Sequence, residues 1–242
     1  MHVKVLDDRV VERAKARGVD ALVYAPHFTR LPNIERKAAA FSDDDLLVVP
    51  AREVFTGSWR DRKHVLAVGL TDPVPDFITL EGAMRELDRQ GAAALAPHPE
   101  FLNVSLDEAD VRRFDVDAVE VYNPKHWPVN NERARDIASA TGVPGFGSSY
   151  AHLRGSIGEV WTAFEEDVGG GGDLAALLRD RAPRRVFHRE GFEHNLRRAA
   201  EFAHLGYENS WGKVDRVLLS ATEPTHPGHI AYQGRFDDVR VY

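Results

Sequence analysis

The sequence predicts an α/β domain whose mainly parallel sheet curls into a barrel. Short apolar runs alternate with amphipathic helical stretches along most of the 242 residues, as is typical of repeated strand–helix units. Each run is almost continuously apolar, which is expected of strands that are covered on both faces. Seven runs with helices between them favour a barrel over an open sheet, although periodicity alone does not decide closure. The strands are expected at residues 2–6, 20–25, 46–50, 63–70, 92–97, 117–122 and 143–148.

The stretches between these strands carry the helical pattern. Two of them have a recognisable beginning, because Thr79-Leu-Glu and Asp107-Glu-Ala-Asp place negative charge in a first helical turn. The helices are expected at residues 8–17, 32–41, 79–90, 107–113 and 130–141.

Four consecutive glycines, Gly169 to Gly172, form the clearest linker in the chain. We therefore expect a barrel domain over residues 1–168 and a small C-terminal extension over residues 173–242 that packs on the barrel. The extension should contain a helix at 173–181, a strand with the sequence Arg-Arg-Val-Phe-His, a helix at 190–206 and a polar tail.

Composition excludes several classes of protein. The formal net charge of -7 and the lack of an evident basic face make nucleic acid an unlikely partner. The chain has no cysteine, which rules out disulfides and thiolate metal sites and favours a cytoplasmic location. No apolar run is long enough to span a membrane, so no membrane association is expected. A homo-oligomer is left open.

Five histidines and one glutamate stand at the ends of the expected strands. The loops at one end of a strand–helix barrel gather on a single face, so residues far apart in sequence meet there. A single histidine beside an apolar run is usually a packed or capping residue, but six strand-end residues of this kind weaken that interpretation. Imidazoles and a carboxylate together are typical metal ligands. The six candidate ligands are His2, His27, Glu53, His64, His98 and His152.

Glu53, His64 and His98 form the most coherent group. Two imidazoles and one carboxylate are a recurrent zinc set that leaves one coordination position open. A divalent ion there would lower the pKa of its water and supply hydroxide for attack on phosphorus or carbonyl carbon. His27 and His152 are candidate ligands of a second ion, with Glu53 bridging, or candidate catalytic proton carriers. One or two ions of zinc, manganese or iron are therefore expected.

The order and spacing of these motifs resemble those of the PHP (polymerase and histidinol phosphatase) superfamily over roughly residues 1–165. His98-Pro99 meets the family's His-Pro motif in full, and Glu53 and His64-Val-Leu match a strand ending in glutamate and a strand beginning with histidine. The remaining motifs match in part. His2-Val-Lys4 stands in the place of the family's His-x-His, and Ala25-Pro26-His27 in the place of Thr-Asp-His. The segment from Gly147 to His152, which Ile157-Gly158 follows, corresponds to Gly-Ser-Asp-Ala-His.

The resemblance implies a distorted (β/α)7 barrel with up to three metal ions. It also implies a metal-dependent phosphoesterase, here expected to hydrolyse a small phosphomonoester or nucleotide. Three departures weaken one metal position: Lys4 replaces a histidine, and Pro26 and Tyr150 stand where the family has aspartates. A site with one or two ions is therefore better supported than one with three.

Cationic side chains near the candidate ligands are expected to hold a phosphate. They are Lys4, Arg30, Arg52 and Arg154. By contrast, His126, His188, His194 and His204 are interpreted as surface residues. Two other functions are left open: a degenerate barrel that acts as a non-catalytic binding or assembly subunit, and a metal-dependent amidohydrolase.

Overall fold

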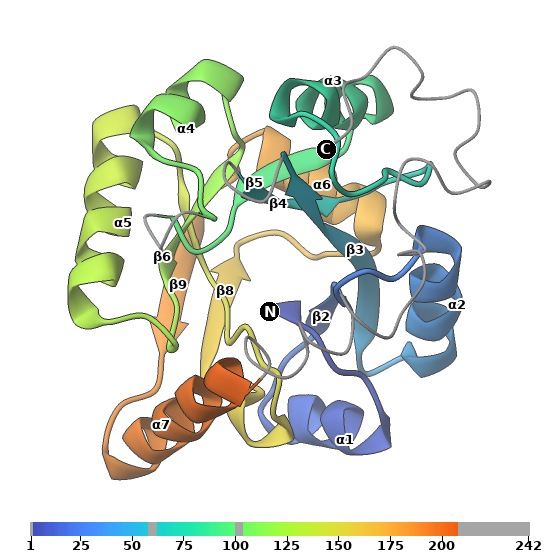
Figure 1. Cartoon of the computed structure of the whole chain (residues 1–242). Helices are drawn as coiled ribbons and strands as arrows, with labels where there is room; N and C mark the ends of the chain where they lie inside the picture. Colours follow the sequence, from blue (N-terminus) through green and yellow to red (C-terminus); the bar gives the residue numbers. More distant parts are fainter. Residues whose placement is uncertain (1, 58–61, 100–103, 208–242) are drawn as a thin grey trace.

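The computed structural model describes residues 2–57, 62–99 and 104–207. Its main sheet has seven strands in the sequential order β1 to β7, and helices surround them (Figure 1). The prediction of a distorted α/β barrel is confirmed. The strands are β1 (His2–Val3), β2 (Ala21–Tyr24), β3 (Leu47–Thr56), β4 (Lys63–Val68), β5 (Ala93–Ala96), β6 (Ala118–Tyr122) and β7 (Gly145–Gly147).

One strand, β4, makes the barrel irregular, because it runs antiparallel to both β3 and β5 while the other neighbouring strands are parallel. The short connection from Thr56 to Lys63 explains the β3–β4 pairing, since a parallel crossover needs about a dozen residues or more. Closure is nearly complete: Val3 bridges Ala151 beyond β7, and the Lys4 amide donates to the Ala151 carbonyl at 3.1 Å.

Helices lie around the outside of the curled sheet (Figure 1). The hydroxyl of Thr79 and the carboxylate of Asp107 accept backbone N–H groups and cap two of these helices, in agreement with the sequence pattern. The helices are α1 (Asp8–Ala16), α2 (Leu31–Phe41), α3 (Leu80–Gln90), α4 (Glu108–Phe114) and α5 (Pro128–Thr141).

Both faces of the strands are buried, which explains their continuous apolar runs. In β2, for example, Leu22 packs with α1 and α2, whereas Val23 belongs to the cluster inside the barrel. That inner cluster also contains Leu174 and Leu178 of α6 (Gly171–Arg179). The helix approaches so closely that a Cβ atom at Gly69 would lie 2.5 Å from the Ala175 side chain.

The expected glycine linker leads directly into α6, because that helix begins at Gly171. After α6, β9 (Arg184–His188) pairs antiparallel with β8 (Val160–Phe164), a strand that the sequence pattern missed. The turn η1 (Arg154–Ser156) and the helix α7 (Phe192–Tyr207) contact each other. The division into domains at residues 168 and 173 stays a prediction, and the polar tail lies outside the described residues. Across the described part of the chain, no helix has both the length and the apolar character needed to cross a membrane.

Candidate metal centre

The irregular strand β4 brings His64 to the same end of the barrel as the other candidate ligands. His64 begins its strand, so in an all-parallel barrel it would lie at the opposite end from residues that follow strands. Because β4 is antiparallel, His64 pairs instead with Phe55, near the end of β3. Glu53 is two residues earlier on β3, and His98 comes two residues after the end of β5.

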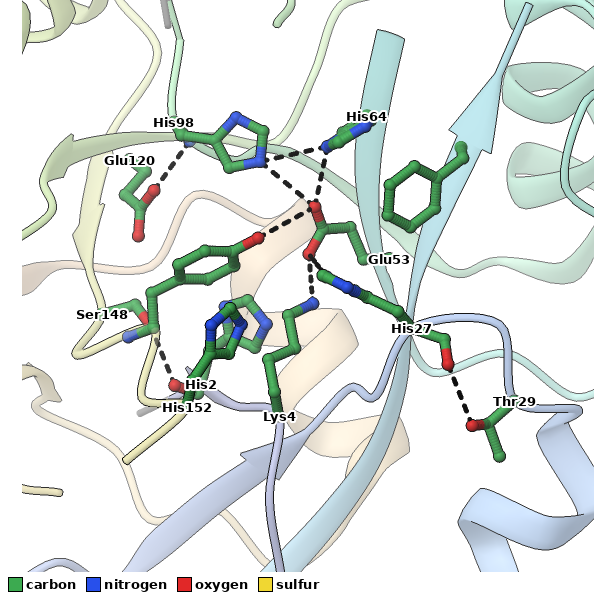
Figure 2. A network of polar contacts seen from close by, with 12 residues as sticks. His2, Lys4, His27, Thr29, Glu53, His64, His98, Glu120, Ser148 and His152 are labelled. Carbon is green, nitrogen blue, oxygen red and sulfur yellow. Dashed lines mark hydrogen bonds and ion pairs between the residues drawn. The ribbon is translucent and has the colours of Figure 1, made fainter. Parts of the chain in front are cut away.

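Glu53, His64 and His98 form a buried triangle of possible metal ligands (Figure 2). Glu53 Oε1 lies 2.9 Å from His64 Nδ1 and 3.1 Å from His98 Nε2, and the two ring nitrogens are 3.3 Å apart. Ligand atoms about 2.1 Å from a tetrahedral ion lie about 3.4 Å from one another. The three separations are close to that value, so the residues fit a divalent ion with only a small outward movement.

The backbone and a hydroxyl orient His98. Its φ of 36° is in the left-handed region, which is unusual for a residue other than glycine and is often found at functional sites. Its backbone N–H donates to Glu120 Oε2 at 2.7 Å, and its Nδ1 lies 3.4 Å from the Ser105 hydroxyl. These contacts turn Nε2 towards Glu53, as outer-sphere partners do for metal-binding imidazoles.

The protonation states suit metal binding. Burial lowers the pKa of His64 to about 4, so the ring is neutral at pH 7. Burial raises the pKa of Glu53, but Lys4 and the three neighbouring histidines outweigh this effect and hold it well below its usual value. His64 Nε2 is buried and has no hydrogen-bond partner among the described residues. A carboxylate with neutral imidazoles is the donor set that divalent zinc, manganese or iron requires.

The other oxygen of Glu53 faces a cation that the chain itself supplies. The Lys4 ammonium forms an ion pair with Glu53 Oε2, and His27 Nε2 lies 3.4 Å from the same oxygen (Figure 2). Burial lowers the pKa of His27 to about 3 and, together with Lys4, lowers that of His2 well below its usual value. His2 packs edge-on against Tyr150, and neither of its ring nitrogens has a hydrogen-bond partner among the described residues.

A second lysine, Lys125, lies beside His152. Its ammonium is 2.9 Å from His152 Nδ1, 3.1 Å from Glu201 Oε2 and 4.4 Å from the centre of the Tyr150 ring. The Glu201 carboxylate also accepts the backbone N–H groups of His152 and Leu153. Helix α7 therefore contributes a buried carboxylate to the barrel mouth, 49 residues after His152 in the sequence.

The cations expected to hold a phosphate are mostly engaged by the protein. Arg52 is buried and pairs with Asp76 at 2.9 Å, and Lys4 is paired with Glu53. Arg154 pairs with Asp7 at 2.7 Å on the surface. Each of these three residues thus has an acidic partner in the chain, and its expected contact with a phosphate stays a prediction. Arg30 lies at the N-terminal end of α2 and stays a prediction.

Two histidines interpreted as surface residues are buried. His126 lies 6.3 Å from His98, measured between ring centres. His194 Nδ1 contacts Glu159 at 2.9 Å, and its Nε2 lies 3.2 Å from the Tyr122 hydroxyl. The surface interpretation of both residues is wrong, because α7 packs over positions that look like exposed loop and helix in the sequence.

Sequence reasoning also missed three buried charged residues: Glu120, Lys125 and Glu201. Burial raises the pKa of Glu120 to about 7. A signal existed for Glu120, which interrupts the apolar run Ala-Val-Glu-Val-Tyr of β6. The motif comparison passed over Lys125, and nothing local distinguishes Glu201 from the other acidic residues of α7.

Two cavities lie near the centre but not over the ligand triangle. One, of about 650 Å³, is lined by His2, Asp20, Leu47 and Phe146 among others, and runs along the inside of the barrel towards the strand starts. The other, of about 380 Å³, is lined by Lys125 and by α7 residues, including Phe202. The second cavity includes Lys125, which contacts His152.

Sequence comparison identifies one family segment. Residues 128–183 match the model of the family described as PHP-associated, a segment that runs from α5 to the start of β9. No curated protein matches the chain.

Solved structures show the same fold at low sequence identity. The chain is similar to PsfC from Pseudomonas syringae PB-5123, with a TM-score of 0.61 and 20% identity over 85% of this chain and 97% of PsfC. It is also similar to a proposed metal-dependent phosphoesterase from Bifidobacterium adolescentis ATCC 15703, with a TM-score of 0.51 and 14% identity over 74% and 94% of the two chains.

A third similar structure is Endonuclease Q in complex with a 27-mer duplex substrate that has an abasic lesion at the active site. The TM-score is 0.53 and the identity 13%, over 76% of this chain and 57% of Endonuclease Q. This finding overturns the expectation that the partner is a small phosphorylated molecule and that nucleic acid is an unlikely partner. Net charge was the wrong guide, because it averages over the whole surface and does not report the field at one groove.

Proposed function

We propose that this chain is a metal-dependent phosphoesterase of the PHP superfamily that cleaves a phosphodiester bond of nucleic acid, a proposal supported by its PHP-associated segment and by the similar structures. The metal-dependent and phosphoesterase parts of the proposal rest on the ligand triangle and on the similar phosphoesterase. The nucleic-acid part rests on the similarity to Endonuclease Q and on the surface beside Lys125.

The observation that carries the proposal is the triangle of Glu53, His64 and His98. Its separations of 2.9, 3.1 and 3.3 Å fit the edges of a tetrahedral metal site. One carboxylate and two imidazoles are a donor set that recurs at divalent-metal sites with an open coordination position. When bound, a divalent ion supplies Lewis-acid chemistry, because it polarises a phosphoryl oxygen and lowers the pKa of water towards neutrality.

His152 is the proposed proton donor to the leaving oxygen. The Lys125 ammonium has only donors, so His152 Nδ1 must accept its hydrogen at 2.9 Å. In the neutral ring the remaining proton is then on Nε2, the nitrogen that can donate to a substrate oxygen. His27 lies near it, with 5.9 Å between the ring centres, and its lowered pKa keeps it a neutral acceptor.

Exposed aromatic side chains beside the Lys125 cavity suit a nucleic-acid substrate. Trp127 is 61% exposed and meets Phe202, which is 44% exposed, with the ring centres 5.5 Å apart. Nucleobases stack on such rings with little dependence on sequence. The cavity next to these rings is lined by Lys125, so a base held there would lie near His152.

The test is hydrolysis of labelled single-stranded, duplex and abasic oligonucleotides with added manganese or zinc. The wild-type chain should release product, and His98→Ala should lower the rate by roughly a thousandfold, because it removes one of three ligands. His188→Ala is the matched control, since His188 is an exposed histidine that stacks on Tyr122. Absence of cleavage of every oligonucleotide, or equal activity in His98→Ala, would reject the proposal.

A barrel that binds nucleic acid without cleaving it is the second candidate. Lys4 favours it, because its ammonium neutralises the carboxylate that a metal ion would need. In that case the oligonucleotides should bind with equal affinity in the presence of manganese and of a chelator, and none should be cleaved.

A further inference from the structure

Two lysine ammonium groups lie inside the centre, on the side away from the ligand triangle. Lys4 and Lys125 are 9% and 2% exposed, and they lie 5.1 and 4.4 Å from the centre of the same Tyr150 ring. Buried lysines are rare, because desolvation of an ammonium is costly unless an anion pairs with it. Each has such an anion: Glu53 for Lys4 and Glu201 for Lys125.

The Lys4 ammonium is paired with Glu53 Oε2, the oxygen to which a second metal ion would bind. Glu53 Oε1 faces His64 and His98, whereas Oε2 faces the Lys4 ammonium and His27. Glu53 can hold one ion on each oxygen only if both oxygens are available to metals. An ion on Oε2 would lie directly against a positive charge beside a fully buried carboxylate, where charges repel more strongly than in water.

The Lys125 ammonium contacts another candidate ligand, His152. His152 Nδ1 faces Lys125 at 2.9 Å, so this nitrogen is already used as a hydrogen-bond acceptor. Glu201 balances the Lys125 charge from α7, at 3.1 Å. The buried ion pairs at the centre therefore contain two carboxylates and two ammonium groups. One divalent ion on the triangle gives this set a net charge of about +2, and further ions would raise it steeply.

We propose that Lys4 and Lys125 act as built-in cations, so that the centre binds one divalent ion, on Glu53, His64 and His98, and has no second metal position. The inference rests on the metal-binding part of the proposed function and specifies its stoichiometry. Lys4 acts through Glu53 and is a positioning residue. A one-ion centre leaves the ammonium groups, in place of a second metal, to supply the remaining positive charge near a bound phosphate.

The test is metal stoichiometry, measured by elemental analysis and by calorimetric titration with manganese and zinc. The wild-type chain should bind one equivalent. Lys4→His should bind two and give the magnetically coupled electron paramagnetic resonance signal of a manganese pair, because it replaces the ammonium with a ligand. Lys37→His is the matched control, an exposed lysine on α2, and should stay at one equivalent.

Lys4→Met covers the case in which Lys4→His does not fold, which circular dichroism would show. It keeps the length of the side chain and removes its charge, so manganese should bind to the triangle at least about tenfold more tightly. Two equivalents in the wild-type chain overturn the inference, as does an unchanged manganese affinity in Lys4→Met. One equivalent without hydrolysis supports the inference and rejects the proposed function, whereas a chain that binds no metal rejects both.

Discussion

The barrel mouth has two halves that use similar residues differently. The histidine half consists of Glu53 Oε1, His64 and His98, and its donors face one another without a cation of the protein between them. The lysine half consists of Lys4, Lys125, His152 and Glu201, where each donor faces an ammonium group. Both halves are buried and rich in imidazole and carboxylate, so donor type alone does not distinguish them.

This difference indicates that the charged groups of the protein itself decide where a metal ion can bind. In the histidine half, burial keeps His64 neutral beside the ionised Glu53 carboxylate, and the Lys4 ammonium lies on the far oxygen of that carboxylate rather than among the three donors. In the lysine half, the Lys125 ammonium lies directly against both His152 and Glu201. Sequence motifs identify possible metal ligands in both halves, whereas the positions of the charged groups distinguish one half from the other.

The largest expected effect tests the lysine half. Glu201→Gln should lower the free energy of unfolding by about 3–5 kcal/mol, because it leaves Lys125 buried without its anion. Glu193→Gln is the control on the same helix; its carboxylate is 77% exposed and pairs with Arg197, so its effect should be below about 1 kcal/mol. Urea unfolding of both variants measures the difference. Equal losses would show that Lys125 does not depend on Glu201.

A smaller effect tests the histidine half through pH. The pKa of His64 is about 4 in the folded chain against an ordinary value of 6.5, so between these values the unfolded chain binds more protons. Stability of the metal-free chain should therefore fall on acidification from pH 6.5 towards pH 4, by about 1.4 kcal/mol per pH unit for such a histidine. His64→Gln should reduce this slope in urea unfolding at pH 7 and pH 5. A slope that does not change would contradict the assignment of a neutral, buried His64.

The smallest expected effect concerns the cavity beside the lysine half. Trp127→Ala should raise the KM for a cleaved oligonucleotide roughly fivefold, or about 1 kcal/mol, because it removes one stacking surface. The kcat should stay close to the wild-type value, since Trp127 contacts Phe202 and none of the triangle. Trp161→Ala serves as the comparison, because Trp161 stacks on Phe187 in the β8–β9 sheet. An equal rise in KM for both variants would argue against a base on Trp127.

Much of the barrel was predictable from local pattern. The apolar runs gave all seven strands of the main sheet, and Thr79 and Asp107 marked helix starts correctly. The antiparallel direction of β4 was harder to predict, because the hydrophobic pattern of a strand does not show in which direction it runs beside its neighbours. The strand β8 was missed for a similar reason: its partner β9 comes after α6, and only that pairing stabilises it.

The candidate site was predictable as a set of residues but not as a geometry. The six strand-end residues do gather at one end of the barrel, and Glu53, His64 and His98 form a compact cluster. Whether any of them binds a metal ion stays a prediction. The ion pairs of Arg52 with Asp76 and of Arg154 with Asp7 were not predictable, because each partner lies far away in the sequence.

The sequence alone determined the repeating strand–helix order, the strand-end ligands and the departures at Lys4, Pro26 and Tyr150. These are properties of residue type and short-range spacing, which act before the chain is folded. Only the tertiary structure decided that Lys4 faces Glu53, that Lys125 faces His152, and that Glu201 arrives from α7 to balance it. The energy of a charge depends on what surrounds it after burial, and residues distant in the sequence supply those surroundings.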